Sequence, residues 1–298
     1  MQRSVVLSLA LCAGLAFAGP VVAKPRKPPS APPAAPAAPT EADWRVPDPQ
    51  DVLVIDTSKG RIIVEMNDTA APNSVARIRQ LTRAGVYDGR AFFRVVDNFM
   101  DQTGDPLDSG VGDSSLPNLA AEFTFKRASD MPVVVVGRIG GTEMAMLGSL
   151  PLISQPMDLG LLTADHKVQA YGTYCAGVVG MARSDDPDSA NSQFFLTRTN
   201  ANSPDKGTHG MDAKYTAWGR AIVGQDVIDA IKIGEPVPDP KDTMTKVQVL
   251  ADMPEATRPK VRVIDVRGAY FKALVDQTRA REPAGVSVCD LLLPVEVK

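Results

Sequence analysis

Apolar residues occur in short runs along most of the chain, and their alternation with polar residues predicts many strands and few helices. The region after residue 51 begins with two β-rich runs, Val52–Ile55 and Arg61–Met66, joined by a turn in which Gly60 can adopt a positive φ. Further strands are predicted at Ala91–Val96, Val133–Val136, Val178–Ala182, Gln193–Thr197 and Lys260–Val266.

Helical spacing of apolar residues is found in fewer places. Pro72 opens the first predicted helix and Gly85 ends it. Val75, Ile78 and Leu81 lie on one face of that helix. The other predicted helices are Gln225–Ile233 and, in the tail, Tyr270–Arg281. Two well-marked helices among many short strands favour a closed or nearly closed antiparallel barrel with helical plugs.

The first residues have the order of a secretory signal peptide. Arg3 supplies a positive start, and the apolar stretch Val5–Ala18 that follows is too short to span a bilayer. Small residues then offer cleavage after Ala18 or Ala23, and we favour Ala23 because Val21 and Ala23 fit the small −3 and −1 positions of that site. We therefore expect a signal peptide at 1–23, export to the periplasm, and no membrane span after cleavage.

A proline- and alanine-rich stretch follows at 24–50. Of the 25 prolines in the chain, ten lie between Pro20 and Pro49. Such a composition buries too little apolar surface to offset the entropy of ordering, so a disordered linker is predicted.

Composition narrows the function classes. The chain has 298 residues, of which 44% are hydrophobic and 22% are charged, as expected of a globular protein with a core. The net charge of −3 disfavours a nucleic-acid partner, because there is no basic excess to neutralise phosphates. With only two histidines, a histidine-rich metal centre is also disfavoured.

Three segments carry a functional signal when they are read together and in order. They are residues 92–105 (FFRVVDNFMDQTGD), residues 180–196 with GMAR followed by SQFFL, and residues 211–219 (MDAKYTAWG). Together they resemble the cyclophilin family of peptidyl-prolyl cis–trans isomerases, over roughly residues 52–233. The resemblance implies a mainly β fold, with a closed antiparallel eight-stranded barrel capped by two helices.

The resemblance also assigns roles to individual residues. Arg94 matches the catalytic arginine of the family, and Gln102 matches its glutamine neighbour. Proline-pocket positions are matched by Phe99, Met100, Phe195 and Met211, and other peptide-binding or pocket-edge positions by Ala182, Arg183, Gln193 and Tyr215. The implied partners are proline-containing unfolded polypeptides, and we expect a monomer.

Isomerisation suits these residue types. The X–Pro bond has a rotational barrier of ~18–20 kcal/mol because its amide is resonance-stabilised. A twisted amide nitrogen is a better hydrogen-bond acceptor, so a guanidinium aimed at it binds the twisted state more tightly than either planar state. No bond is broken, and we therefore expect no nucleophile, metal or cofactor.

The chain departs from the family pattern at several places. Phe93 stands where histidine is usual and Thr103 where glycine is usual, while Gly210 replaces a tryptophan linked to cyclosporin binding. We place the isomerase domain at 51–235, with an insertion at about 126–174. Residues 236–298 then form a C-terminal extension packed on the domain.

The cysteines leave two interpretations open. Without the signal peptide, Cys175 beside the insertion and Cys289 in the tail remain, in a chain bound for an oxidising compartment. They form either a disulfide that ties the two additions together or two buried thiols.

Two other functions also remain open. One is a non-catalytic proline-peptide-binding chaperone of the cell envelope, and the other is a hydrolase that uses Ser203 or Cys175.

Overall fold

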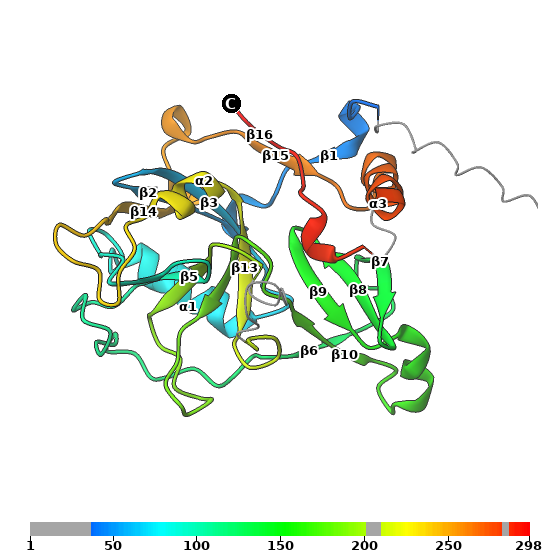
Figure 1. Ribbon diagram of the computed structural model, residues 1–298, viewed down its shortest axis with the longest axis horizontal. Helices are drawn as coiled ribbons and strands as arrows, with labels where there is room; N and C mark the ends of the chain where they lie inside the picture. The colour runs from blue at the N-terminus through cyan, green and yellow to red at the C-terminus, as the bar shows by residue number, and fades with distance from the viewer. Residues whose placement is uncertain (1–36, 201–209, 282–285) are drawn as a thin grey trace, which may run out of the picture. The chain divides into compact units, whose positions relative to one another are not determined.

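Antiparallel sheets form the framework of the computed structural model, which describes residues 37–200, 210–281 and 286–298 (Figure 1). The largest sheet is curled and has eight strands. In spatial order they are β14 (Met244–Val249), β2 (Val52–Thr57), β3 (Gly60–Met66), β13 (Ala217–Val223), β11 (Val178–Met181), β12 (Phe194–Thr197), β5 (Met100–Thr103) and β4 (Arg94–Val96). The predicted mainly β fold is confirmed.

Helices α1 (Pro72–Arg83) and α2 (Gln225–Ala230) contribute side chains to the core of this sheet. Val75, Ile78 and Leu81 of α1 are all buried there, as their spacing predicts. Gly85 follows the helix with a φ of 70°, a left-handed conformation that glycine adopts without strain. The hairpin between β2 and β3 turns at Gly60, whose φ is 140°. The local sequence patterns therefore identified these elements correctly.

The expected closure of the barrel is not confirmed. β4 and β14 are the edge strands, and no ladder joins them in the described structure. An isolated bridge between Ala91 and Thr243 joins the residues that precede the two strands. The predicted domain boundary also needs correction. The eighth strand, β14, begins at Met244, so a boundary at 235 would cut it off from the sheet.

The insertion forms a sheet of its own with five strands. These are β6 (Phe125–Arg127), β10 (Val168–Gly172), β9 (Leu150–Ser154), β8 (Thr142–Leu147) and β7 (Val133–Ile139). Only β7 was predicted. The sequence of β8, TEMAML, consists mostly of residues that favour helices, and pairing with β7 and β9 overrides that preference.

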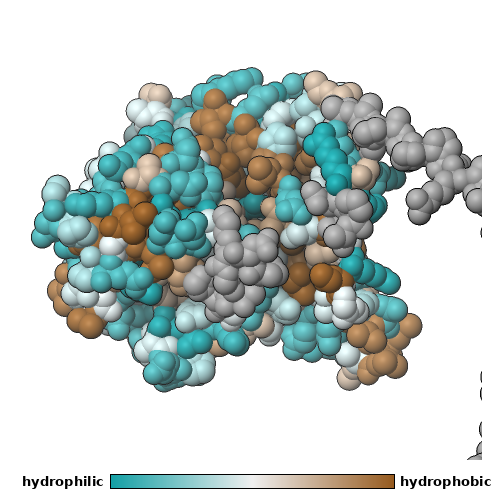
Figure 2. All heavy atoms as spheres, viewed as in Figure 1, coloured by the Kyte–Doolittle hydropathy of each residue, from teal (hydrophilic) through white to brown (hydrophobic). Residues whose placement is uncertain are grey.

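One end of the insertion is apolar and exposed. The 3₁₀ helix η3 (Met157–Leu162) carries Leu161 and Leu162, which are 80% and 82% exposed. Figure 2 shows a brown apolar patch over this part of the molecule, at the lower right, and other apolar patches separated by polar surface.

The tail adds a helix and, together with a strand from the N-terminal side, a three-stranded sheet. The strands are β1 (Trp44–Arg45), β15 (Val261–Ile264) and β16 (Val295–Val297), and the helix is α3 (Ala269–Arg281). Because β1 pairs with β15, the predicted disordered linker at 24–50 is wrong for its last part. The predicted signal peptide and residues 24–36 lie outside the described residues. Among the helices of the described ranges, none is long and apolar enough to cross a membrane.

Short 3₁₀ helices complete the described elements. They are η1 (Glu41–Asp43), η2 (Pro49–Asp51), η5 (Leu250–Asp252), η6 (Glu255–Thr257) and η7 (Val288–Asp290).

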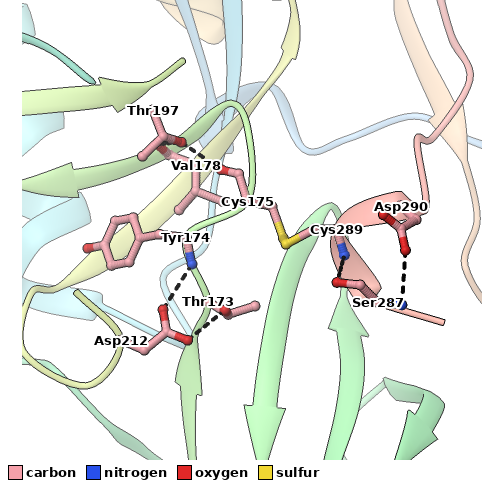
Figure 3. Close-up of a disulfide and its surroundings, with 9 residues drawn as sticks. All are labelled: Thr173, Tyr174, Cys175, Val178, Thr197, Asp212, Ser287, Cys289 and Asp290. Carbon is pink, nitrogen blue, oxygen red and sulfur yellow. Dashed lines mark hydrogen bonds between the residues drawn. A yellow bond between two sulfur atoms is a disulfide. The ribbon is translucent and has the colours of Figure 1, made fainter. Parts of the chain in front are cut away.

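A disulfide joins the tail to the start of β11. Cys175 and Cys289 are 5.0 Å apart between their Cα atoms and 114 residues apart in sequence (Figure 3). The Cys175 carbonyl accepts a hydrogen bond from Thr197 Oγ1 at 2.6 Å, and the backbone N–H of Cys289 donates to Ser287 Oγ at 3.2 Å. Cys175 is therefore held against β12, and Cys289 is held within its own turn of the tail.

Candidate active site

The registers of three neighbouring strands bring the predicted catalytic residues together. Arg94 in β4 lies opposite Gln102 in β5, and Gln102 lies opposite Phe195 in β12. Residues directly opposite each other in a sheet point to the same face. The two polar side chains and the phenylalanine are therefore presented on one surface of the sheet.

Hydrogen bonds connect these side chains in a row. Arg94 Nη1 donates to Gln102 Oε1 at 3.3 Å, and Arg94 Nε donates to Glu235 Oε2 at 3.1 Å. Gln102 Nε2 in turn donates to Gln193 Oε1 at 3.0 Å, and Gln193 Nε2 donates to the Gly112 carbonyl at 2.9 Å. The row orients the guanidinium, although the Arg94 side chain remains 41% exposed.

A buried carboxylate organises the loop that ends this row. Asp105 accepts hydrogen bonds from the backbone N–H groups of Leu107, Ser109, Gly110 and Gly112. Burial by itself raises the pKa of Asp105, but these bonds outweigh it, and the net pKa is lowered. The charged form therefore holds the loop so that the Gly112 carbonyl can accept the hydrogen bond from Gln193.

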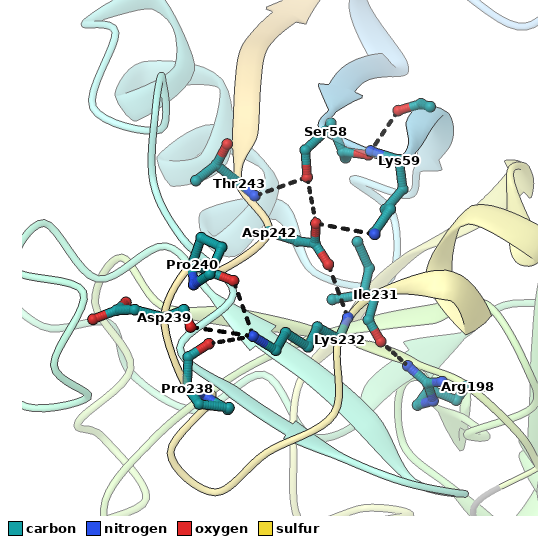
Figure 4. A network of polar contacts seen from close by, with 12 residues as sticks. Ser58, Lys59, Arg198, Ile231, Lys232, Pro238, Asp239, Pro240, Asp242 and Thr243 are labelled. Carbon is teal, nitrogen blue, oxygen red and sulfur yellow. Dashed lines mark hydrogen bonds and ion pairs between the residues drawn. The ribbon is translucent and has the colours of Figure 1, made fainter.

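The segment that carries Glu235 is fastened at two points (Figure 4). Asp242 accepts hydrogen bonds from Ser58 Oγ at 2.7 Å and from the backbone N–H of Lys232 at 2.9 Å. Lys232 Nζ donates to the backbone carbonyls of residues 238–240. Glu235 thus belongs to a tethered loop, and no sequence motif pointed to it.

The predicted proline-pocket residues form one apolar cluster beside the row. Met100, Phe195 and Met211 are 2%, 3% and 2% exposed, and Phe99 and Tyr215 are half-buried against them. The ring centroids of Phe195 and Tyr215 are 6.0 Å apart. The structure therefore brings these residues together.

Gly180 permits this packing. A Cβ atom at this position would lie 2.6 Å from the Phe195 ring and 2.4 Å from Tyr174 Oη. Both separations are too short for a side chain of any size. Glycine in β11 is thus required for the position of Phe195.

The remaining predicted residues lie just past the end of β11. The backbone N–H of Ala182 donates to the Gln193 carbonyl at 3.0 Å. The Arg183 guanidinium lies 4.5 Å from the Tyr215 ring centroid, and its Nε donates to the Lys214 carbonyl at 2.9 Å. Arg183 is therefore stacked and oriented at the edge of the apolar cluster.

Two open cavities meet at Gln102. One, of about 410 Å³, is lined by Arg94, Gln102 and Glu235 among others. The second, of about 390 Å³, is lined by Gln102, Ala182, Arg183 and Gln193 among others. An extended peptide laid across both would pass the guanidinium at one end and Arg183 at the other.

Comparison with known proteins identifies the family and the fold. The family model for cyclophilin type peptidyl-prolyl cis-trans isomerase/CLD matches residues 52–250. The chain belongs to the cyclophilin family. A probable peptidyl-prolyl cis-trans isomerase of Brucella suis is 30% identical over 198 residues, which cover 63% of this chain and 74% of the relative. The peptidyl-prolyl cis-trans isomerase cyp18 of Streptomyces antibioticus is 32% identical, over 60% of this chain and 81% of its own length.

A solved structure extends the likeness beyond the shared sheet. The crystal structure of cyclophilin AquaCyp293 from Hirschia baltica matches with a TM-score of 0.76 and 31% identity. It covers 85% of this chain and 93% of its own chain. The chain is therefore a cyclophilin-type peptidyl-prolyl isomerase, and proteins of this type bind proline-containing peptides.

The disulfide decides one of the alternatives that the sequence left open. Cys175 is bonded to Cys289, so it is not a free thiol nucleophile. Ser203, the other nucleophile considered, lies outside the described residues. Residues that sequence reasoning missed are Glu235 and the carbonyl of Gly112, because both reach the site from segments without a recognisable motif.

Proposed function

We propose that this cyclophilin accelerates X–Pro rotation in unfolded or partly folded exported proteins, with Arg94 as the catalytic residue. The observation that carries the proposal is the state of the Arg94 guanidinium. Its Nε and Nη1 are held by Glu235 and Gln102, and no described residue accepts a hydrogen bond from Nη2. A donor that is oriented and unoccupied, at the rim of a cavity of about 410 Å³, suits a substrate amide.

The mechanism follows from differential binding. A planar prolyl amide has a poor acceptor at nitrogen, whereas the twisted amide has a localised lone pair. A hydrogen bond from Arg94 to that nitrogen therefore stabilises the twisted state more than either planar isomer. Gln102 and Glu235 reduce the reorganisation that the guanidinium needs. The apolar cluster around Phe195 supports the proposal because it offers a surface for the proline ring.

The test is a coupled isomerisation assay on a proline tetrapeptide. We expect Arg94→Ala to lower kcat/KM at least tenfold, because the amide nitrogen then loses its donor. Arg94→Lys keeps the charge but not the planar fork, and it should recover only part of the rate. Arg83→Ala is the matched control, since Arg83 is an exposed arginine on α1 that pairs with Asp252.

Near-normal turnover by Arg94→Ala would contradict the mechanism. Absence of turnover in the wild type, with retained peptide binding, would instead favour the non-catalytic chaperone. Retained far-ultraviolet circular dichroism and Tm in each variant would show that the fold persists.

Export to the periplasm is proposed from the N-terminal residues, which have the order of a signal peptide. Fractionation of expressing cells, followed by mass determination of the mature N-terminus, tests it. Cleavage after Ala23 or Ala18 supports the proposal, and a full-length cytoplasmic product would contradict it. Sedimentation of the mature protein tests the expected monomer.

A further inference from the structure

Arg220 in β13 is a buried cation without a partner. The residue is only 6% exposed, and its guanidinium makes no hydrogen bond or ion pair with any described residue. Burial lowers the pKa of Arg220 to about 10, and the side chain is therefore still charged at neutral pH. A buried charge without compensation is unfavourable, and such groups are normally paired.

The natural partner of Arg220 is already occupied. Glu65 in β3 lies directly opposite Arg220 in the sheet. However, both carboxylate oxygens of Glu65 accept hydrogen bonds from Arg45, at 2.5 Å and 2.8 Å. Glu65 is therefore paired with Arg45, and no ion pair joins it to Arg220.

Arg220 lines a cavity of about 210 Å³. Its other walls include Ser149, Ala176, Gln225, Leu292 and Leu293. This volume far exceeds the ~30 Å³ that one water molecule occupies in the liquid. Apart from the guanidinium, the polar side chains are those of a serine and a glutamine, and the rest of the lining is largely aliphatic.

The disulfide links two walls of this cavity. Ala176 follows Cys175 directly, and Leu292 and Leu293 come shortly after Cys289. Figure 3 shows the two bridged segments meeting where the tail approaches the start of β11. The tail therefore covers what would otherwise be an exposed face of β13, and it creates the cavity around Arg220.

We propose that this cavity binds a small monocarboxylate with a short aliphatic group, whose carboxylate pairs with Arg220. A guanidinium matches a carboxylate in planar, two-point geometry. A single cation with few other donors suits one negative charge better than a doubly charged phosphate. The aliphatic walls suit a short hydrocarbon group. The same chemistry is available from a free short-chain acid and from the C-terminal carboxylate of a peptide.

The experiment measures thermal unfolding and calorimetric binding of the purified mature protein with sodium butyrate. Butyramide, which has the same shape without the charge, and sodium chloride at equal ionic strength are the matched ligand controls. We expect a saturable rise in Tm with butyrate alone. N-acetyl-leucine in a parallel titration imitates a peptide C-terminus. A larger rise in Tm with N-acetyl-leucine than with butyrate would indicate that the cavity binds peptide C-termini. A smaller rise would indicate that it binds free short-chain acids.

Variants connect the response to the cavity. Arg220→Met should abolish the butyrate response, and its own Tm should equal or exceed that of the wild type, because it removes an uncompensated charge. Leu292→Trp should also abolish the response by filling the cavity, and the position tolerates bulk because Leu292 is 69% exposed. Arg83→Gln should respond normally. The proposal is overturned if the wild type shows no saturable response, or if Arg220→Met responds as the wild type does.

Discussion

Arg94 and Arg220 both lie on the eight-stranded sheet, in opposite electrostatic situations. The Arg94 side chain is 41% exposed and is held by a glutamine and a glutamate. Arg220 is 6% exposed and has no partner among the described residues. Water and Glu235 compensate the charge of Arg94, so a substrate can bind there and leave reversibly. The second charge has no partner from the described residues, and the cavity beside it has room for a group that could pair with it.

The two regions also differ in how they are built. The Arg94 site is made by β4, β5, β12 and neighbouring loops, all within the part of the chain that matches the family model. The Arg220 cavity needs the tail, because Leu292 and Leu293 form part of its wall. The C-terminal tail therefore covers part of β13 and forms a cavity that the eight-stranded sheet alone would not have.

The largest effect in this comparison should come from removing the disulfide. We expect the double variant Cys175→Ala/Cys289→Ala to lose about 3 kcal/mol of unfolding free energy, because the cross-link closes a long loop. Urea unfolding measures this loss, and the reduced wild type should behave alike. The butyrate response should weaken while tetrapeptide turnover stays within about twofold. A parallel collapse of turnover would show that the two regions are not separable.

An intermediate effect is expected in the Arg94 region, at Asp105. Asp105→Asn should lower the unfolding free energy by about 2 kcal/mol at pH 7, because a charged acceptor of several backbone bonds is lost. The folded pKa of Asp105 lies below its ordinary value of 3.8. Its contribution is therefore present above that pH and is lost as the pH falls through the folded pKa.

The difference in stability between the wild type and Asp105→Asn should accordingly shrink below about pH 4. Asp68→Asn, at an exposed position, is the control and should change little. A constant difference at all acidic pH values would argue against the charged form as the organiser of the loop.

The smallest effect is expected at Glu235. Its ion pair with Arg94 is exposed on both sides, and such pairs contribute about 0–1 kcal/mol. We expect Glu235→Gln to leave Tm unchanged and to lower kcat less than about threefold, with KM almost constant. Lys241→Gln, on the same cavity wall, serves as the control. A tenfold loss of kcat would instead show that the isomerisation step requires Glu235.

Sequence reasoning succeeded where signals are local. The helix face of Val75, Ile78 and Leu81 and the turn at Gly60 were predicted correctly because each depends on a few adjacent residues. It failed for the insertion, where β8 has helix-favouring residues and becomes a strand only by pairing with its neighbours. It also failed for Trp44 and Arg45, whose strand exists only because β15 lies beside them.

The sequence by itself determined the family, through motifs in a characteristic order, and with it the arginine and glutamine that face each other in β4 and β5. Only the tertiary structure decided that Glu235 reaches Arg94, that no ladder joins β4 to β14, and that Arg220 is buried without a partner among the described residues. The physical reason is that charge compensation and burial depend on residues far apart in the chain. Glu65, for example, lies opposite Arg220 but is bonded to Arg45.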